Sequence, residues 1–108
     1  MAGPEDVAPA RLRIDVWLWR ARVVKTRARA AELAQSGHVR VNGQRISAAG
    51  RGVKIGDVLT IALERTVRVL RVADFGDRRG PATEARALFE DLAPHQNDNA
   101  APQDDPLE

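Results

Sequence analysis

The hydrophobic spacing of the chain changes period at Gly37, and this change limits the possible folds more than any other feature. Before Gly37, four apolar residues recur at the i, i+3, i+4, i+7 spacing of one helical face: Ile14, Trp17, Leu18 and Ala21. They predict a helix over residues 13–21. Thr26 is a favourable N-cap for a second, alanine-rich helix from Arg27 to Ser36, and Gly37 supplies the left-handed residue that ends it.

Beyond Gly37 the apolar residues alternate, as they do in strands. Val39 and Val41 flank Arg40, and the Asn42-Gly43 pair that follows is a strong signal for a tight hairpin turn. Short strands interrupted at Gly56-Asp57 are predicted from five apolar positions: Val53, Ile55, Val58, Leu59 and Ile61. A further strand is predicted over Thr66–Ala73, where apolar residues are interspersed with two arginines: Val67, Val69 and Ala73 with Arg68 and Arg71.

The last predicted element is a short helix after Pro81, over residues 82–92. Four apolar residues would lie on one side of it: Ala85, Leu88, Phe89 and Leu92. The predicted order is therefore two short helices, a small antiparallel sheet and one final helix. This order indicates an α+β domain in which the two N-terminal helices pack on the sheet.

The charge is divided unevenly along the chain, although the net charge is only +2. Residues 11–71 hold fourteen Lys or Arg and four Asp or Glu, a net +10, whereas residues 72–108 carry a net −6. Arginine outnumbers lysine fifteen to two, and arginine can bind phosphate in a planar, forked geometry. The division predicts a polyanion-binding domain followed by an acidic segment.

The cations concentrate at the first helix and at the turn into the second. Six of them fall within seventeen residues: Arg13, Arg20, Arg22, Lys25, Arg27 and Arg29. The N-terminus of the second helix adds a partial positive charge and free N–H groups, and Thr26 can cap it or donate to a phosphate. Arg45 and Lys54 lie near predicted loops and extend the basic surface. Such a surface suits an RNA backbone, and it is equally compatible with DNA.

Two tryptophans and one acid within this region need separate interpretations. Trp17 has core spacing and is expected to pack inside the domain. Trp19 lies closer to the Asp15/Arg22 face, so we expect it to pack, to stack on an arginine, or to contact a base. Asp15 is interpreted as an orienting partner of Arg22 or Arg29 rather than as a catalytic acid.

Four spaced segments together resemble the S4 RNA-binding domain, whose motifs read roughly R-L-D-x-x-L, S/T-R-x-x-A and G-x-V-x-V-N-G. These segments are Arg13-Ile14-Asp15, Leu18 to Arg22, Thr26-Arg27 with Ala30, and Gly37 to Gly43. Val53 to Leu59 is similar to the closing P-G-D-x-L segment of that domain. The resemblance spans about residues 11–61 and implies an S4-like (αL) fold that recognises structured RNA.

A narrower set of residues resembles the heat-shock protein 15 family. It comprises Asp15 to Trp19, Arg22, Lys25 to Arg27, Asn42 to Arg45, Pro81-Ala82, Glu84-Ala85 and Leu88 to Glu90. That family consists of small ribosome-associated proteins, which implies binding to rRNA on large ribosomal subunits stalled with peptidyl-tRNA. The sequence is thus divided into a flexible arm (1–10), an S4 domain (11–73), a C-terminal helical extension (74–93) and a disordered acidic tail (94–108).

Several other classes of protein are not indicated. The chain has no cysteine, and His38 and His95 lie far apart, so we expect neither a metal site nor a cofactor. No apolar run has the length of a membrane span, and we expect a cytoplasmic monomer without catalytic activity. Two alternatives stay open: an RNA-targeting subunit of a separate RNA-modifying enzyme, and a general nucleic-acid-binding regulator.

Overall fold

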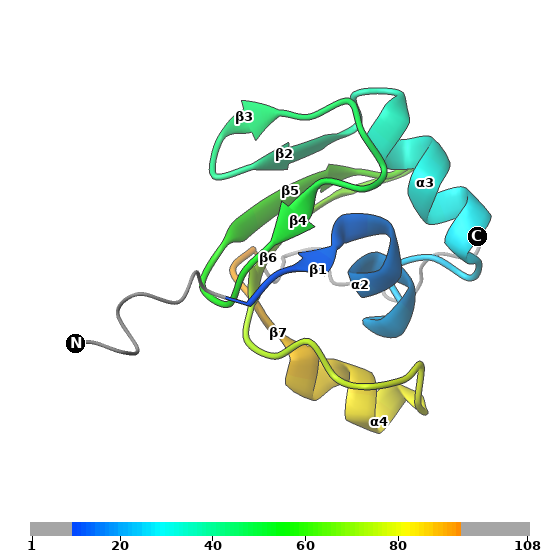
Figure 1. The fold of residues 1–108 in the computed structure, drawn as a ribbon, viewed down its shortest axis with the longest axis vertical. Coiled ribbons are helices and arrows are strands. Elements are labelled where there is room, and N and C mark those ends of the chain that lie inside the picture. The colour runs from blue at the N-terminus through cyan, green and yellow to red at the C-terminus, as the bar shows by residue number, and fades with distance from the viewer. Residues whose placement is uncertain (1–9, 94–108) are drawn as a thin grey trace.

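A computed structural model describes residues 10–93 of the chain (Figure 1). The predicted acidic tail, and all but the last residue of the predicted N-terminal arm, lie outside the described residues. The described part begins with strand β1 (Leu12–Arg13), followed by helices α2 (Ile14–Arg20) and α3 (Arg27–Gln35). Both helices begin and end within one residue of their predicted bounds, which confirms the helical spacing.

The two helices end in the same way but with different residues. The N–H of Gly37 donates to the carbonyl of Ala34, and that of His38 donates to the carbonyl of Leu33. These two bonds form the Schellman motif, and Gly37 has the expected left-handed φ of 81°. At the end of α2, Arg22 and Val23 make the corresponding two bonds, to the carbonyls of Trp19 and Leu18. Arg22 therefore occupies a position that usually belongs to glycine, with φ at 61°.

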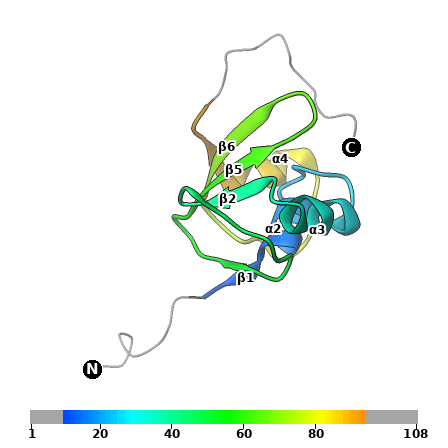
Figure 2. The same ribbon diagram turned by 90° about the horizontal axis from the view of Figure 1, so that it is seen from above.

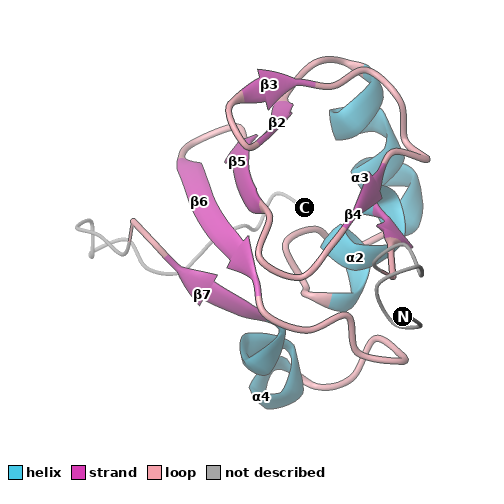
Figure 3. Ribbon diagram, turned by 60° about the vertical axis from the view of Figure 1, so that its left-hand side comes forward, coloured by secondary structure: helices cyan, strands magenta, loops and turns pink. Residues whose placement is uncertain are grey.

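The rest of the described chain is mostly an antiparallel sheet of five strands, in the order β3-β2-β5-β6-β7 (Figure 3). The strands are β2 (Val39–Val41), β3 (Gln44–Arg45), β5 (Val58–Ala62), β6 (Val67–Val72) and β7 (Phe89–Asp91). Asn42 and Gly43 both have positive φ between β2 and β3, as a type I′ hairpin turn requires. A separate two-stranded sheet pairs β1 with β4 (Gly52–Val53).

Helices α2 and α3 lie on one side of the sheet (Figure 2), and the hydrophobic core fills the space between them. Its largest fully buried side chains come from both layers: Trp17, Ile14, Leu18, Leu59, Ile61 and Leu70. Trp17 is buried, as predicted, and its indole Nε1 donates to the carbonyl of Asp74 at 2.9 Å. The order of elements and their layers confirm the predicted α+β, S4-like fold.

The predicted C-terminal helix is correct only in its first half. Helix α4 (Ala82–Ala85) continues into a 3-10 turn, η1 (Arg86–Leu88), but residues 89–91 form strand β7. Phe89 pairs with Val72, and Asp91 pairs with Leu70, so β7 completes the edge of the sheet. Arg71 bonds to Glu90 across these strands. Hydrogen bonding to the open edge of β6 outweighs the helical spacing of the apolar residues, because it satisfies backbone groups that a helix would leave unpaired.

One smaller strand prediction also needs correction, and the register of β6 shows which of its residues are buried. Ile55 lies in the turn between β4 and β5, with 53% of its surface exposed, and belongs to no strand. On β6 the buried residues are Leu70 and Val72, whereas Val67 is 55% exposed. The register explains this, because Leu70 lies opposite Leu59 on the core face of the sheet. Alternation alone does not say which of its two sets faces inward.

Candidate nucleic-acid interface

Asp15 holds two of the predicted arginines next to each other. The Arg13 side chain forms a forked pair with it, Nε to Oδ1 at 3.1 Å and Nη2 to Oδ2 at 2.9 Å. Nη2 of Arg27, at the start of α3, lies 4.0 Å from the same Oδ2. Asp15 is buried, whereas the arginine side chains are 57% and 52% exposed. Asp15 was predicted to orient Arg22 or Arg29, and this choice of partner was wrong, because its partners are Arg13 and Arg27.

The carboxylate of Asp15 stays ionised despite its burial. Burial alone would raise its pKa, but hydrogen bonds from Arg13 and the charges of Arg13 and Arg27 outweigh that effect. The pKa of Asp15 therefore lies below its ordinary value, and the same contact raises the pKa of Arg13. The buried anion fixes the Arg13 guanidinium by two hydrogen bonds and attracts that of Arg27 by charge, while both arginine side chains stay exposed to solvent.

The N-terminus of α3 lies beside this pair. Thr26 is the N-cap, as predicted, and its Oγ1 accepts a hydrogen bond from the backbone N–H of Arg29 at 3.0 Å. Lys25 and Arg27 flank this cap, and both are exposed. The free backbone N–H groups and the helix dipole add to their positive charge. This end of α3 therefore combines the features of an anion-binding surface.

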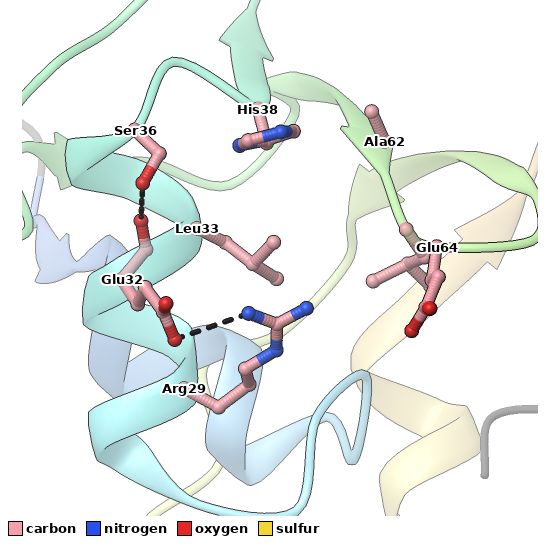
Figure 4. A pocket seen from close by; sticks show the side chains of 8 residues that line it. Arg29, Glu32, Leu33, Ser36, His38, Ala62 and Glu64 are labelled. Carbon is pink, nitrogen blue, oxygen red and sulfur yellow. Dashed lines mark hydrogen bonds and ion pairs between the residues drawn. The ribbon is translucent and has the colours of Figure 1, made fainter. Parts of the chain in front are cut away.

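Arg29 faces a different direction from Arg27, because residues two apart on a helix point to different sides. Its guanidinium points into a hollow of about 360 Å³ between α3 and the end of β5 (Figure 4). There its Nη1 bonds to Oε1 of Glu32 at 3.1 Å. His38 and Glu64 border the same hollow. The six clustered cations of the sequence therefore do not share one face.

Arg20 is directed into the loop that joins β6 to α4, residues 73–81. Its Nη1 donates to the carbonyl of Gly76 at 2.8 Å and of Phe75 at 3.5 Å. Arg22 makes a similar contact, with its Nε donating to the carbonyl of Gly80 at 2.7 Å. Both arginines were predicted from the sequence as RNA contacts, and the structure gives them an additional role in holding this loop.

Trp19 is partly buried, and its ring contacts an arginine that the sequence did not single out. The guanidinium of Arg79 lies over its ring, 5.9 Å from the centroid. Arg79 also donates from Nε to the carbonyl of Trp19 at 3.0 Å and from Nη2 to the carbonyl of Val24 at 3.3 Å. Of the three roles expected for Trp19, stacking on an arginine is therefore observed.

The remaining two predicted residues lie at other places on the surface. Lys54 donates from Nζ to Oδ1 of Asp57 at 3.0 Å, in the turn before β5. Arg45 lies on β3, directly opposite Arg40 of β2, and its aliphatic stem passes close to Gly37. Neither belongs to the group formed by Arg13 and Arg27.

Sequence reasoning did not single out two further arginines, Arg40 and Arg79. Arg40 had a detectable signal, because it alternates with Val39 and Val41 and must point away from the core. Arg79 had none, because it lies in an acidic segment and contacts a carbonyl 60 residues earlier in the chain.

Among residues 10–93 no group of three His, Asp or Glu could hold a metal ion. Within that range, too, every helix is too short or too polar to cross a bilayer.

Comparison with known proteins identifies the family. The S4 domain model matches residues 12–59. Heat shock protein 15 of Escherichia coli K12 is 40% identical over 82 residues, which cover 76% of this chain and 61% of that protein. A homolog in Aeromonas salmonicida is 36% identical over 91 residues, covering 84% of this chain and 67% of the homolog. The chain belongs to the heat shock protein 15 family.

A solved member of the heat shock protein 15 family has the same fold. The trimeric structure of the Vibrio cholerae protein has a TM-score of 0.71 and 33% identity, and the match covers 78% of this chain and 84% of that one. Small ribosomal subunit protein uS4 of Xanthobacter autotrophicus is 37% identical over 71 residues, which cover 64% of this chain and 35% of that protein. The chain spans about 61% of the length of the Escherichia coli relative.

The S4 match includes all ten residues predicted as RNA contacts, from Arg13 to Lys54. The loop of residues 73–81, with α4 and β7, lies outside that match. Arg79 therefore lies outside the S4 match but contacts Trp19, one of the predicted RNA-binding residues within it.

Proposed function

We propose that the protein is a non-catalytic RNA-binding protein that binds structured rRNA. The observation that carries the proposal is the buried Asp15 carboxylate, which holds the exposed guanidinium groups of Arg13 and Arg27 beside the N-terminus of α3. A fixed arginine fork loses less conformational entropy when it binds phosphate than a free one does. The family relationship supports the same conclusion, because relatives include ribosomal proteins as well as heat shock protein 15.

The binding would use phosphate contacts first. Arg13, Lys25 and Arg27 would each neutralise backbone phosphates, and the helix N-terminus would add N–H donors. Most of the affinity would then come from counterion release and would fall steeply with salt. Selection of an irregular rRNA element would follow from the shape of this surface, since phosphate contacts carry no sequence information directly.

The most specific target that we propose is the large ribosomal subunit stalled with peptidyl-tRNA, in the cytoplasm. This target follows from the resemblance to the family and not from geometry. The monomeric state expected from the sequence also stays a prediction. The Vibrio cholerae relative is trimeric, and light scattering with and without RNA would decide between the two states for this chain.

Neutralising the two exposed cations at the start of α3 tests the RNA-binding proposal. In Lys25→Gln/Arg27→Gln, affinity for a fluorescein-labelled bulged RNA hairpin should fall at least tenfold at moderate salt. The log–log salt slope should flatten by roughly 1.4 to 1.8, the value for two lost phosphate contacts. Fluorescence anisotropy measures both quantities.

The matched control is Arg65→Gln/Arg86→Gln, which removes the same charge from two exposed arginines outside this surface. It should bind RNA nearly as well as the unaltered chain. Equal losses in both double variants would show that net charge alone drives binding and that the assigned surface is wrong. A duplex DNA of the same length, measured in parallel, would show whether the surface prefers RNA.

A further inference from the structure

Arg22 occupies a backbone position that favours glycine. It is the left-handed residue of the motif that ends α2, a conformation in which most residues with a side chain are strained. Glycine at the corresponding position after α3 shows that the chain can meet this requirement without strain. An exposed arginine kept in a strained conformation is more typical of a functional side chain than of a structural one.

Arg22 and Arg79 each donate hydrogen bonds to backbone carbonyls within three residues of the other arginine. The side chain of Arg22 reaches the carbonyl of Gly80, and that of Arg79 reaches the carbonyls of Trp19 and Val24. These reciprocal contacts place both guanidinium groups on one patch. The carbonyls at the end of α2 carry the negative end of the helix dipole, which favours a cation there. These carbonyls are neutral dipoles, so the pair of arginines keeps its net positive charge.

The two arginines have no acidic partner among residues 10–93. Nearby Glu84 bonds instead to Arg78, at 2.9 and 2.7 Å through its two oxygens. In the described residues, both Nη groups of Arg22 and the Nη1 group of Arg79 make no hydrogen bond. Burial lowers the pKa of Arg79, and the neighbouring positive charge of Arg22 lowers it further.

We propose that Arg22 and Arg79 form a joint site for one backbone phosphate of the bound RNA. The site rests on the proposed RNA-binding function and extends it from the S4 segment to the loop of residues 73–81. A phosphate would accept hydrogen bonds from the unused Nη groups and neutralise the repulsion between the arginines. The Arg79 guanidinium stacks on the ring of Trp19, so it is already oriented before the RNA binds.

A purely structural clasp would explain only part of this arrangement. It accounts for the hydrogen bonds from Nε of Arg22 and of Arg79. It does not explain why position 22 holds an arginine, because a glycine there would end α2 with less strain. It also does not explain why two cations lie together without an acid. The two interpretations predict different responses to salt, because only a phosphate contact releases counterions.

The direct test compares Arg79→Gln with Arg86→Gln, an exposed arginine of the same segment. With the bulged RNA hairpin, Arg79→Gln should lower affinity roughly tenfold and flatten the log–log salt slope by up to about 0.9, the value for one phosphate. Arg86→Gln should change neither by much. The double variant Arg22→Gly/Arg79→Gln should flatten the slope by no more than about 0.9, because the two arginines share one phosphate.

Two further measurements keep the proposal testable if Arg79→Gln folds poorly. Arg22→Gly relieves the strained φ, which offsets the lost hydrogen bond to the Gly80 carbonyl. The variant should therefore unfold no more easily than the unaltered chain while binding RNA more weakly. In the unaltered chain labelled with ¹⁵N, the Arg79 Nε–H and Trp19 indole signals should shift as RNA is added, whereas the indole of buried Trp17 should not.

The outcomes separate this inference from the function on which it rests. If the unaltered chain binds RNA but Arg79→Gln matches Arg86→Gln in affinity and slope, the joint site is overturned and the RNA-binding function stands. An Arg79 Nε–H signal that stays unmoved at saturating RNA leads to the same conclusion. If the unaltered chain does not bind RNA at all, both proposals are overturned.

Discussion

Two buried aspartates organise basic residues in the described part of the chain. Asp15 fixes Arg13 and Arg27, and Asp57 accepts hydrogen bonds from the Lys54 backbone and side chain and from the Asn42 amide. Asp57 thereby ties the turn before β5 to the tip of the β2–β3 hairpin. In both cases one buried anion orients groups at the surface. Hydrogen bonds to each carboxylate offset the free-energy cost of removing its charge from water.

These aspartates predict an acid-sensitive fold. Burial opposes their ionisation, but hydrogen bonds and neighbouring cations lower the pKa of each below its ordinary value. A carboxyl with a lowered pKa stabilises the folded state fully above its unfolded pKa of about 3.9. That contribution is lost as the pH falls through the folded pKa. The free energy of unfolding, measured with urea from about pH 7 to pH 3, should therefore drop below about pH 4.

The variant Asp15→Asn isolates the share of one carboxylate. It should lower the free energy of unfolding by about 1 kcal/mol at pH 7, which is less than a hydrogen bond to a charged group usually contributes, because water screens the exposed Arg13. Its stability should also depend less on pH below about 4. If Asp15→Asn kept the full pH dependence of the unaltered chain, Asp15 would not be one of the groups responsible.

At the level of elements, the junction between α3 and β2 depends on Gly37. Its φ of 81° favours glycine, and an added Cβ would lie 3.2 Å from Cδ of Arg45. Gly37→Ala should therefore lower the free energy of unfolding by roughly 1 to 2 kcal/mol. Gly50→Ala is the control, because Gly50 lacks a positive φ and its Cβ would meet Arg13 only at 3.6 Å. Similar urea midpoints for both variants would contradict the assigned role of Gly37.

Local signals explain which elements could be predicted from the sequence. Helix α3 and the β2–β3 hairpin depend on residues close in the chain, such as the Thr26 cap and the Asn42-Gly43 turn. Strand β7 depends instead on pairing with β6, about twenty residues earlier. The same limit applied to the candidate site: Thr26 could be assigned from its neighbours, whereas the place of Arg79 depends on tertiary contacts.

At the level of the whole molecule, the loop of residues 73–81 connects the sheet with the underside of α2. Its backbone carbonyls accept hydrogen bonds from the side chains of Trp17, Arg20 and Arg22. In return, its Arg79 side chain donates a hydrogen bond to the carbonyl of Trp19 in α2. These contacts join a segment outside the S4 match to the turn that leads into α3. The segment after the S4 domain therefore acts as part of one folded unit, and it fixes the direction in which the basic turn is presented.

This rigid presentation leads to a prediction about the proposed ribosomal target. A surface held in one orientation should distinguish between two states of the same rRNA, because its forks match only one arrangement of phosphates. We expect the protein to bind purified large subunits that carry nascent peptidyl-tRNA at least tenfold more tightly than empty large subunits. Cosedimentation at several protein concentrations and at moderate salt measures this difference.

The variant Lys25→Gln/Arg27→Gln serves as the control for this experiment and should lose binding to both kinds of subunit. A preference for occupied subunits that disappears in this variant would place the discrimination at the basic end of α3. Equal and weak binding to occupied subunits, empty subunits and the bulged RNA hairpin would contradict the proposed target. Binding that resists salt would contradict the mechanism as well, because contacts to several phosphates must weaken as counterions become more abundant.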